Sequence, residues 1–389
     1  MKVLIINSVC GTGRICLELA RMVSKQGGEA VIAYGRGSGI PDETGVQTHR
    51  IGTNLDVCLH GLKTRLTDAH GFGSRRATKK FIRWMRQYDP DVIHLHNLHG
   101  YYLHIGLLFR ALAEMKKPII WTLHDFWPLT GHCAHYDGGD CGKWKTGCGN
   151  CPRKRAYPAS WLLDRSRKNY REKKRLFSMP ERMTLVTPSA WFAGEVGRSF
   201  LGQYPILAIH NGIDTNVCYP ENGKNCGKVV LGVANIWDEH KGLDTMMRLR
   251  SLLGEEWQMV LVGLSEKQIA RLPRGITGIC RTKKAEELAA WYRAADVYVN
   301  ASTGEAMGMT TAEAISCGTP VASFDAGAAA EIVGANGIVA PYGDVDALAD
   351  AVREIDTRGR KPYRVDCGRF TAEKQYEQYW KLYQQLGEK

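Results

Sequence analysis

Short apolar runs rich in β-branched residues alternate with longer amphipathic stretches along the whole chain. Such runs are typical of strands that helices cover on both faces, and their alternation with helical stretches predicts parallel sheets. The fold class is therefore predicted to be α/β. The clearest predicted strands are 3–6, 30–33, 92–95, 119–122 and 184–187 in the first half, and 229–233, 259–262, 297–300 and 320–324 in the second.

A polar segment without periodicity separates these two groups of strands. Residues 211–228 contain Asn-Gly twice, which is typical of turns, so we interpret the segment as a linker. We expect an N-terminal domain over 1–210 and a C-terminal domain over 229–370. The end of the chain, 371–389, is predicted to be a helix whose aromatic residues recur at helical spacing and form its buried stripe. These are Tyr376, Tyr379, Trp380 and Tyr383.

Composition and charge narrow the class of protein. The 389 residues are 44% hydrophobic and 24% charged, which is typical of a globular chain. The net charge is +12, and residues 1–210 alone hold 31 basic and 16 acidic residues, so that half carries +15 and the rest −3. An anionic partner is therefore expected to meet the N-terminal half. No apolar run is long enough to cross a bilayer and the start MKVLIINSVCGTG does not resemble a secretory signal, so we expect a cytoplasmic protein.

The stretch NASTGEAMGMTTAEAISCGTPVAS, which begins at residue 300, carries the most chemistry. It follows a predicted strand, so residues 301–308 should form a loop and 309–317 a helix that a glycine ends. Glu305 then lies in the loop and Glu313 on the helix. A Gly-flanked loop that leads into a helix presents backbone N–H groups and the positive end of the helix dipole to an anion. The pattern therefore predicts an anion site.

The same stretch resembles the E-x7-E signature of the retaining GT-B glycosyltransferases of family GT4. Further motifs occur in the order of that family along nearly the whole chain, and their joint order is specific although each is short. They are MKVLIINSVCGTGR at the start, PDVIHLHN at 90–97, TLHD at 122–125, TPSAW at 187–191, HNGID at 210–214, HKGLD at 240–244 and AADVYVNAS at 294–302. Residues 122–158 are most similar to transferases of bacterial exopolysaccharide and colanic-acid-type assembly.

The resemblance implies two Rossmann-like domains that face one another across a cleft, with the nucleotide-sugar donor held mainly by the C-terminal one. It assigns Glu313 to the ribose hydroxyls and Glu305 to the sugar hydroxyls of the donor. The backbone amides of Gly308, Met309 and Thr310 would face the sugar and the diphosphate. Retention in this family has no obvious side-chain nucleophile, and the usual proposal is a front-face mechanism in which the leaving phosphate helps to deprotonate the acceptor.

Lys241 in HKGLD matches a lysine that the family places on the diphosphate. A fixed cation is needed there because cleavage of the sugar–phosphate bond leaves growing negative charge on the nucleotide. The family usually has an arginine about five residues earlier, where this chain has Asn235 and Ile236. Arg281 and Lys283 are candidates to replace that arginine. A solvated turn lysine is the alternative interpretation of Lys241.

The resemblance also assigns two contacts to the N-terminal domain. His124 in TLHD follows a predicted strand and is expected to approach the donor sugar, and a capping or packing histidine is the alternative. The loop 11–14 opens a helix directly after the first strand. By resemblance this loop, with Gly13, faces the diphosphate and the acceptor, whereas by itself it fits a tight turn between a strand and a helix.

An insert at 132–152, HCAHYDGGDCGKWKTGCGNCP, contains four of the twelve cysteines. They are Cys133, Cys141, Cys148 and Cys151, the last two in a C-x2-C pair. Their type and approximate spacing match a closed tetrahedral zinc site, with His132 and His135 as reserve ligands. A reduced loop without metal and a set of disulfides are the alternatives. No metal is expected to be required for catalysis.

Two further patterns concern the acceptor side. Histidines recur in HLHNLHGYYLH, and we interpret them as lining the acceptor cleft rather than as a metal patch, because no carboxylate accompanies them. They are His94, His96, His99 and His104. The basic excess gathers in RRATKK at 75–80 and in 153–175, where the apolar run 161–163 suggests a helix that lies on anionic lipid. A solvated helix is the alternative.

Together these features predict a retaining glycosyltransferase of hexosyltransferase type. It would move a sugar from a nucleotide-sugar donor to a glycan or polyprenyl-linked acceptor in bacterial surface polysaccharide assembly, at the inner face of the membrane. A non-catalytic relative that binds a nucleotide sugar is one alternative, because the usual arginine is missing. A polyanion- or nucleic-acid-binding protein is another, but no signature of nucleic-acid binding accompanies the charge.

Overall fold

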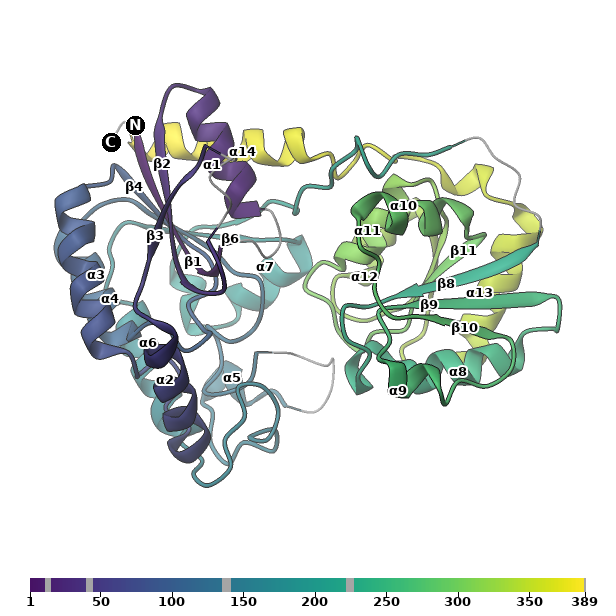
Figure 1. Ribbon diagram of the computed structural model, residues 1–389, viewed down its shortest axis with the longest axis horizontal. Coiled ribbons are helices and arrows are strands. Elements are labelled where there is room, and N and C mark those ends of the chain that lie inside the picture. Colours follow the sequence, from purple (N-terminus) through teal and green to yellow (C-terminus); the bar gives the residue numbers. More distant parts are fainter. Residues whose placement is uncertain (11–14, 40–44, 135–140, 222–226, 388–389) are drawn as a thin grey trace. The chain divides into compact units, whose positions relative to one another are not determined.

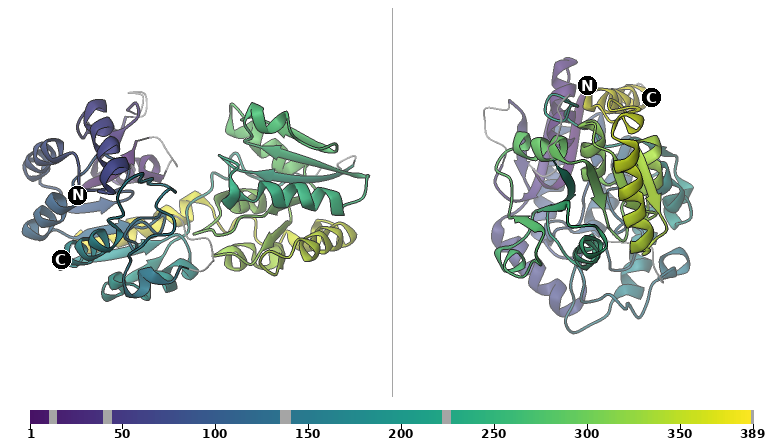
Figure 2. Two further views of the ribbon diagram at one scale, coloured as in Figure 1. Left: turned by 90° about the horizontal axis from the view of Figure 1, so that it is seen from below. Right: turned by 90° about the vertical axis from the view of Figure 1, so that its right-hand side faces the viewer.

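The computed structural model describes residues 1–10, 15–39, 45–134, 141–221 and 227–387. The chain divides into two compact units, the first formed by Met1–Ile209 with Tyr376–Lys389 and the second by His210–Gln375. Each unit contains one parallel sheet with helices packed against it (Figures 1 and 2). This confirms the α/β class that the alternating pattern predicts.

The first unit is built on a parallel sheet that has seven strands among the described residues. Their order is β3 (Gln47–Arg50), β2 (Glu29–Arg36), β1 (Lys2–Val9), β4 (Val92–Leu95), β5 (Ile119–Thr122), β6 (Met183–Thr187) and β7 (Ile206–Ala208). In the central strand β1, Ile5 lies opposite Ile32 of β2 and His94 of β4. Residues 3–6 of β1 are fully buried, which explains why this run is entirely apolar.

Helices connect and cover these strands. They are α1 (Ile15–Lys25), α2 (Asn54–Thr67), α3 (Arg75–Tyr88), α4 (Ile105–Met115), α5 (Lys143–Thr146), α6 (Ser166–Phe177), α7 (Ala190–Gly197), the short 3-10 helix η2 (Phe200–Gln203) and the C-terminal α14 (Ala372–Gly387). Helix α2 begins with a capping box, in which the side chains of Thr53 and Asp56 each accept a bond from the backbone N–H of the other. Among the described residues no helix is both long and apolar enough to span a membrane.

The second unit has a parallel sheet of six strands among the described residues. Their order is β10 (Ile276–Ile279), β9 (Trp257–Val262), β8 (Lys228–Val233), β11 (Val297–Asn300), β12 (Val321–Phe324) and β13 (Gly337–Ala340). The helices are α8 (Leu243–Leu252), α9 (Glu266–Ile269), α10 (Ala285–Ala294), α11 (Met309–Ser316), α12 (Ala329–Val333) and α13 (Val345–Arg358), with 3-10 helices η3 (Glu239–Lys241), η4 (Gly334–Asn336) and η5 (Lys361–Tyr363). One apolar core joins β8, β9, β11 and β12 to α8 and α13.

From Tyr376 onward the C-terminal helix α14 belongs to the first unit, although it follows the second in sequence (Figure 1). Its tyrosines at 376, 379 and 383 are buried, as the aromatic spacing predicts, whereas Trp380 is partly exposed. Two buried hydroxyls fix the helix to the sheet: Tyr383 Oη lies 2.6 Å from His94 Nδ1, and Tyr379 Oη lies 3.1 Å from Thr122 Oγ1.

His94 completes this network from β4. Its Nε2 lies 2.8 Å from Thr122 Oγ1, so both ring nitrogens have partners. Burial lowers the pKa of His94 to about 3, so the ring is neutral. The prediction that His94 lines the acceptor cleft is therefore wrong, because its side chain is fully buried and links β4 and β5 to α14.

The network predicts the effect of removing one hydroxyl. Tyr383→Phe leaves His94 Nδ1 without a partner in the core, and should lower the free energy of unfolding by about 2 kcal/mol. Urea unfolding monitored by circular dichroism measures this. Tyr342→Phe is the control, because Tyr342 is half exposed and its substitution should change little. Equal midpoints for Tyr383→Phe and the wild type would contradict the structural role of the network.

Candidate functional site

Two loops of the second unit bring a lysine and a glutamate together. Strands β8 and β11 are parallel neighbours, so the loops that follow them leave the sheet at the same edge. Lys241 ends η3 in the loop after β8, and Glu305 lies in the loop after β11. Lys241 Nζ is 2.5 Å from Glu305 Oε1, with the glutamate side chain mostly buried and that of the lysine about one-third exposed. The contact is a charged pair at the carboxyl edge of the sheet.

The backbone around Lys241 is fixed by short-range bonds. The Asp238 side chain accepts from the backbone N–H of Lys241 at 3.1 Å, which caps η3. The Thr303 N–H donates to the His240 carbonyl at 2.9 Å, so the two loops are bonded to each other. Gly242 has φ +71°, and a Cβ there would lie 2.4 Å from the Ala301 carbonyl oxygen. Only glycine therefore allows this approach.

A third loop, which follows β12, supports Glu305. The Ala328 N–H donates to the Glu305 carbonyl at 2.9 Å. Gly327 has φ +68°, and a Cβ there would lie 2.3 Å from that same carbonyl oxygen. The loop after β12 therefore holds the backbone of Glu305, and the side chain reaches Lys241 from that fixed backbone.

The helix that follows Glu305 begins without a side-chain cap. Gly308 is the N-cap of α11 with φ +81° and makes no side-chain bond. The two threonine hydroxyls of the first turn bind side chains of β11 instead of capping the helix. Thr310 Oγ1 accepts from Tyr298 Oη at 2.7 Å, and Thr311 Oγ1 accepts from Asn300 Nδ2 at 3.0 Å. Backbone N–H groups at an uncapped helix start favour an anion, because they add to the positive end of the dipole.

Glu313 lies one turn further along α11. Tyr292 Oη donates to Glu313 Oε2 at 2.9 Å. Burial raises the pKa of Glu313 above its usual range, and the hydrogen bond from Tyr292 opposes that shift. The sequence motifs do not assign a role to Tyr292, Tyr298 or Asn300, whose side chains hydrogen-bond residues of α11. A polar Asn300 at the end of an apolar strand is the one signal in the sequence that points to such a contact.

The chain has no arginine at the position where the family usually has one. Asn235 and Ile236 are both exposed in the loop after β8. Arg281 is exposed just beyond β10, and Lys283 follows it. In the sheet order β9 lies between β10 and β8, so Arg281 leaves the same edge two strands away from the loop of Lys241. Its proposed role on the diphosphate stays a prediction.

In the first unit, His124 follows β5 at the carboxyl edge of its sheet. His124 Nε2 lies 2.9 Å from Nδ1 of the buried His96. Burial lowers the pKa of His124 to about 4, so this ring is neutral as well. The predicted loop 11–14, including Gly13, lies outside the described residues.

A second polar group lies beside this pair. His99 Nε2 is 2.6 Å from Asp125 Oδ2, and His99 Nδ1 is 3.0 Å from Tyr157 Oη. The carboxylate therefore orients the ring so that Nδ1 faces the tyrosine hydroxyl. His104 instead caps α4, since its side chain accepts from the Leu107 N–H, so the prediction that it lines the cleft is wrong.

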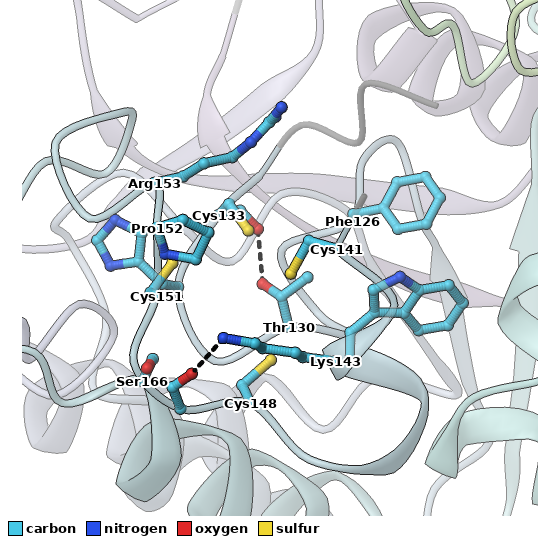
Figure 3. Close-up of a pocket in the computed structure, with 13 residues that line it drawn as sticks. Phe126, Thr130, Cys133, Cys141, Lys143, Cys148, Cys151, Pro152, Arg153 and Ser166 are labelled. Carbon is cyan, nitrogen blue, oxygen red and sulfur yellow. Dashed lines mark hydrogen bonds between the residues drawn. The ribbon is translucent and has the colours of Figure 1, made fainter. Parts of the chain in front are cut away.

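The four insert cysteines line one cavity of about 40 Å³ in the first unit (Figure 3). All four thiols are free. Among the described residues, however, no group of three or more His, Cys, Asp or Glu side chains is arranged to hold a metal ion. The reserve ligand His132 is engaged elsewhere, with Nδ1 2.6 Å from Asp68 Oδ1. His135 lies outside the described residues.

The predicted amphipathic helix over 153–175 is only partly present. Helix α6 begins at Ser166, and Trp161, Leu162 and Leu163 lie in irregular backbone before it. All three are more than half exposed. The prediction of a helix carrying these side chains is therefore wrong, although the apolar run does reach the surface.

Two family models match the chain. The family described as Glycosyltransferase Family 4 matches residues 9–217, which is more than half of the chain. The family described as Glycosyl transferases group 1 matches residues 227–357, the part that contains Lys241, Glu305 and Glu313.

Curated relatives match part of the sequence. The putative colanic acid biosynthesis glycosyl transferase WcaC of Escherichia coli (strain K12) is 32% identical over 221 residues, which are 52% of this chain and 52% of that protein. The MMP alpha-(1->4)-mannosyltransferase of Mycolicibacterium hassiacum is 30% identical over 205 residues, which are 48% of this chain and 49% of that protein. The chain thus spans about half the length of these curated relatives.

Solved structures share the fold at low identity. Sucrose-phosphate synthase from Thermosynechococcus elongatus superposes with a TM-score of 0.71 at 18% identity over 99% of each chain. Anabaena HepE, solved in complex with UDP, superposes with a TM-score of 0.69 at 16% identity over 99% of this chain and 100% of that chain. The two Rossmann-like halves are those of the GT-B fold.

The buried neutral histidines predict a pH dependence of stability. Burial lowers the pKa of both His60 and His94 to about 3, whereas an unfolded histidine titrates near 6.5. Between these values the unfolded chain binds more protons, so stability falls as the pH drops below about 6.5. At pH 5 each of these histidines should lower the free energy of unfolding by about 2 kcal/mol relative to its value at pH 7.5. Urea unfolding at both values measures this, and equal unfolding free energies would contradict it.

Proposed function

The chain belongs to glycosyltransferase family 4, and on this basis we propose that it transfers a sugar from a nucleotide-sugar donor to a glycan or polyprenyl-linked saccharide. The process is the assembly of a bacterial surface polysaccharide, which the partial match to the colanic acid transferase supports. One observation carries the proposal: the Lys241–Glu305 pair stands beside the uncapped start of α11. A cation, a carboxylate and free helix amides together suit a sugar diphosphate.

Each group then has a chemical task. Lys241 and the first amides of α11 stabilise the negative charge that develops on the leaving diphosphate. Glu305 accepts hydrogen bonds from the sugar hydroxyls while still pairing with Lys241, whose ammonium has three donors. Glu313 accepts from the ribose hydroxyls.

The transfer is proposed to retain configuration without a protein nucleophile. Glu305 is bonded to Lys241, which lowers the nucleophilicity of its carboxylate. The leaving phosphate instead accepts the proton of the acceptor hydroxyl as the new glycosidic bond forms on the same face. No metal takes part in this step. A covalent glycosyl adduct trapped on Glu305 would overturn this mechanism.

A non-catalytic protein that binds nucleotide sugars is the second candidate. It is favoured by the exposed Asn235 and Ile236, which stand where the family usually has a cation. Such a protein would bind the donor through Lys241 and Glu313 and would release no nucleotide. Turnover of the donor therefore separates the two candidates.

A donor panel tests the site. Nucleotide sugars at saturating concentration should raise the melting temperature of the wild type, and UDP-glucose is the first to test because HepE has been solved with it. Lys241→Ala removes a charge-assisted hydrogen bond and should weaken donor binding roughly ten- to hundredfold. Lys267→Ala is the control, since Lys267 is exposed on α9. Unchanged binding and unchanged nucleotide release in Lys241→Ala and Glu305→Ala would refute the site.

The proposal includes action at an anionic membrane surface, and an exposed face of the first unit supports this. On α2 four leucines point outward at helical spacing, with exposed fractions between 38% and 66%. They are Leu55, Leu59, Leu62 and Leu66. We call them the leucine face of α2. Exposed leucines repeated over three turns form a patch rather than scattered contacts.

The irregular run 161–163 extends this face. The Trp161 N–H donates to the Arg65 carbonyl at 2.7 Å, and the Arg65 guanidinium lies over the Trp161 ring at 5.6 Å. Exposed cations on α3 line a cavity of about 810 Å³ together with the start of α2. They are Arg76, Lys79, Lys80 and Arg83. Exposed apolar side chains and exposed cations on two helices of one unit suit the headgroup region of anionic lipid.

Vesicle flotation tests the membrane proposal. The wild type should float with vesicles that contain phosphatidylglycerol at low salt, and less so with phosphatidylcholine alone or at high salt. Leu59→Ser with Leu62→Ser should weaken binding about tenfold or more, because two side chains lose apolar burial. Val365→Ser is the control, as Val365 is an exposed apolar residue of the second unit. Failure of the wild type to float with anionic vesicles would contradict the membrane proposal.

A further inference from the structure

The part of the chain from 133 to 153, between β5 and α6, buries few apolar side chains for an irregular segment of its length. Residues 123–165 contain one four-residue helix, α5, among those that the structure describes. From 133 to 153 the buried apolar side chains in the described part are those of Ala134 and Trp144. A long irregular segment with so little burial does not offset its own conformational entropy. Some cross-link is expected to hold it.

Four cysteines meet where that cross-link is needed. Three places in the segment supply them: Cys133 follows the TLHD loop, Cys141 precedes α5, and the C-x2-C pair follows α5. All four line the same small cavity, and Figure 3 shows their sulfur atoms around its centre. Residues far apart in the segment thus present thiols to one point.

The groups around the cavity suit thiolate ligands. The Gly131 N–H donates to Cys148 Sγ at 3.2 Å, the kind of bond that stabilises a metal-bound sulfur. Lys143 Nζ donates to the carbonyls of Gly149 and Asn150 at 3.2 and 3.1 Å and so fixes the C-x2-C turn. Four thiolates around a divalent cation carry two negative charges, which nearby cations would offset.

Cations at different depths around the cavity provide that offset. Lys143 and Arg153 line the cavity directly. Lys173 is buried behind it, and its Nζ donates to the Thr130 carbonyl at 3.0 Å and to the Trp127 carbonyl at 2.6 Å. A lysine is almost never fully buried without a compensating partner, and a negatively charged metal centre next to Thr130 would be one.

We propose that Cys133, Cys141, Cys148 and Cys151 bind one structural zinc ion. The thiols face the cavity without being gathered at metal distance, and zinc would draw each sulfur to about 2.3 Å in a tetrahedron. His132 is not a ligand, because Asp68 holds its Nδ1 and its Nε2 faces the Ala156 carbonyl.

With four protein ligands the centre is closed, so its role is structural rather than catalytic. It fixes the segment that carries Asp125 and Tyr157 against the sheet. The Phe126 N–H donates to the Ala134 carbonyl at 2.9 Å, so the start of the insert is bonded directly to the TLHD loop. Loss of zinc therefore loosens the first unit around His99 and leaves the Lys241–Glu305 pair of the second unit untouched.

Metal analysis of the full chain tests this directly. Protein purified without added zinc should contain about one zinc ion per chain, measured by inductively coupled plasma mass spectrometry. Titration with a mercurial in the presence of a zinc-sensitive dye should release that zinc as the thiols react. Cys148→Ser should lose most of the zinc and lower the melting temperature. Cys58→Ser is the matched control, because Cys58 is exposed on α2 and should keep the zinc.

The outcomes separate the alternatives. A wild-type chain with less than about half an equivalent of zinc overturns the proposal. So does iron in place of zinc, or an intact mass lighter by the hydrogens of disulfides. If Cys148→Ser does not fold, the mercurial release from the wild type decides alone. Donor binding by the second unit should survive zinc removal, so failure here and failure of the proposed transfer are distinguishable.

Discussion

Loops that follow neighbouring parallel strands leave a sheet at the same edge, and this geometric constraint assembles the chemistry of both units. In the second unit it brings Lys241, after β8, to within 2.5 Å of Glu305, after β11. Two glycines then allow the loops to approach closely, since a Cβ at Gly242 or Gly327 would collide with a backbone oxygen. The charged pair thus depends on strand order first and on backbone contacts second.

The same constraint acts in the first unit with a different result. The loops after β4 and β5 bring His96 and His124 together, and His94 lies in β4 itself. Burial keeps these rings neutral: the pKa of His124 falls to about 4 and that of His94 to about 3. His94 turns toward α14, whereas His99 turns toward Asp125 and Tyr157. Residues from one sequence motif therefore divide between holding the fold and lining a polar surface.

Part of the positive charge of the first unit lies on the exposed surface of α3. Exposed cations of α3 line a cavity together with the start of α2, the helix that carries the leucine face. The second unit carries the candidate donor groups and a slightly negative net charge. The excess positive charge therefore lies on the unit that does not carry the candidate donor groups, so donor binding does not account for it.

The sequence by itself determined the buried parts of the fold. All nine predicted strands occur, because a run of apolar, β-branched residues has few ways to be buried other than as a central strand. Among the described residues four further strands occur, β3, β7, β10 and β13, and each lies at the edge of its sheet. Edge strands are partly exposed, so β3 and β10, with the sequences QTHR and ITGI, carry no apolar run. The strands β7 and β13 are apolar but only three and four residues long.

Only the tertiary structure decided which polar residues meet. The motifs marked Lys241 and Glu305, but their contact joins residues 64 positions apart and arises from strand order. The pattern around 161–163 correctly predicted exposed apolar side chains, but the predicted helix is absent from these residues. In a segment without periodicity, charge and hydropathy do not specify the backbone conformation. Likewise, spacing alone grouped the four cysteines, whereas the packing of the insert turned them toward one cavity. Local pattern reports burial, and contacts between distant residues depend on how the buried elements pack.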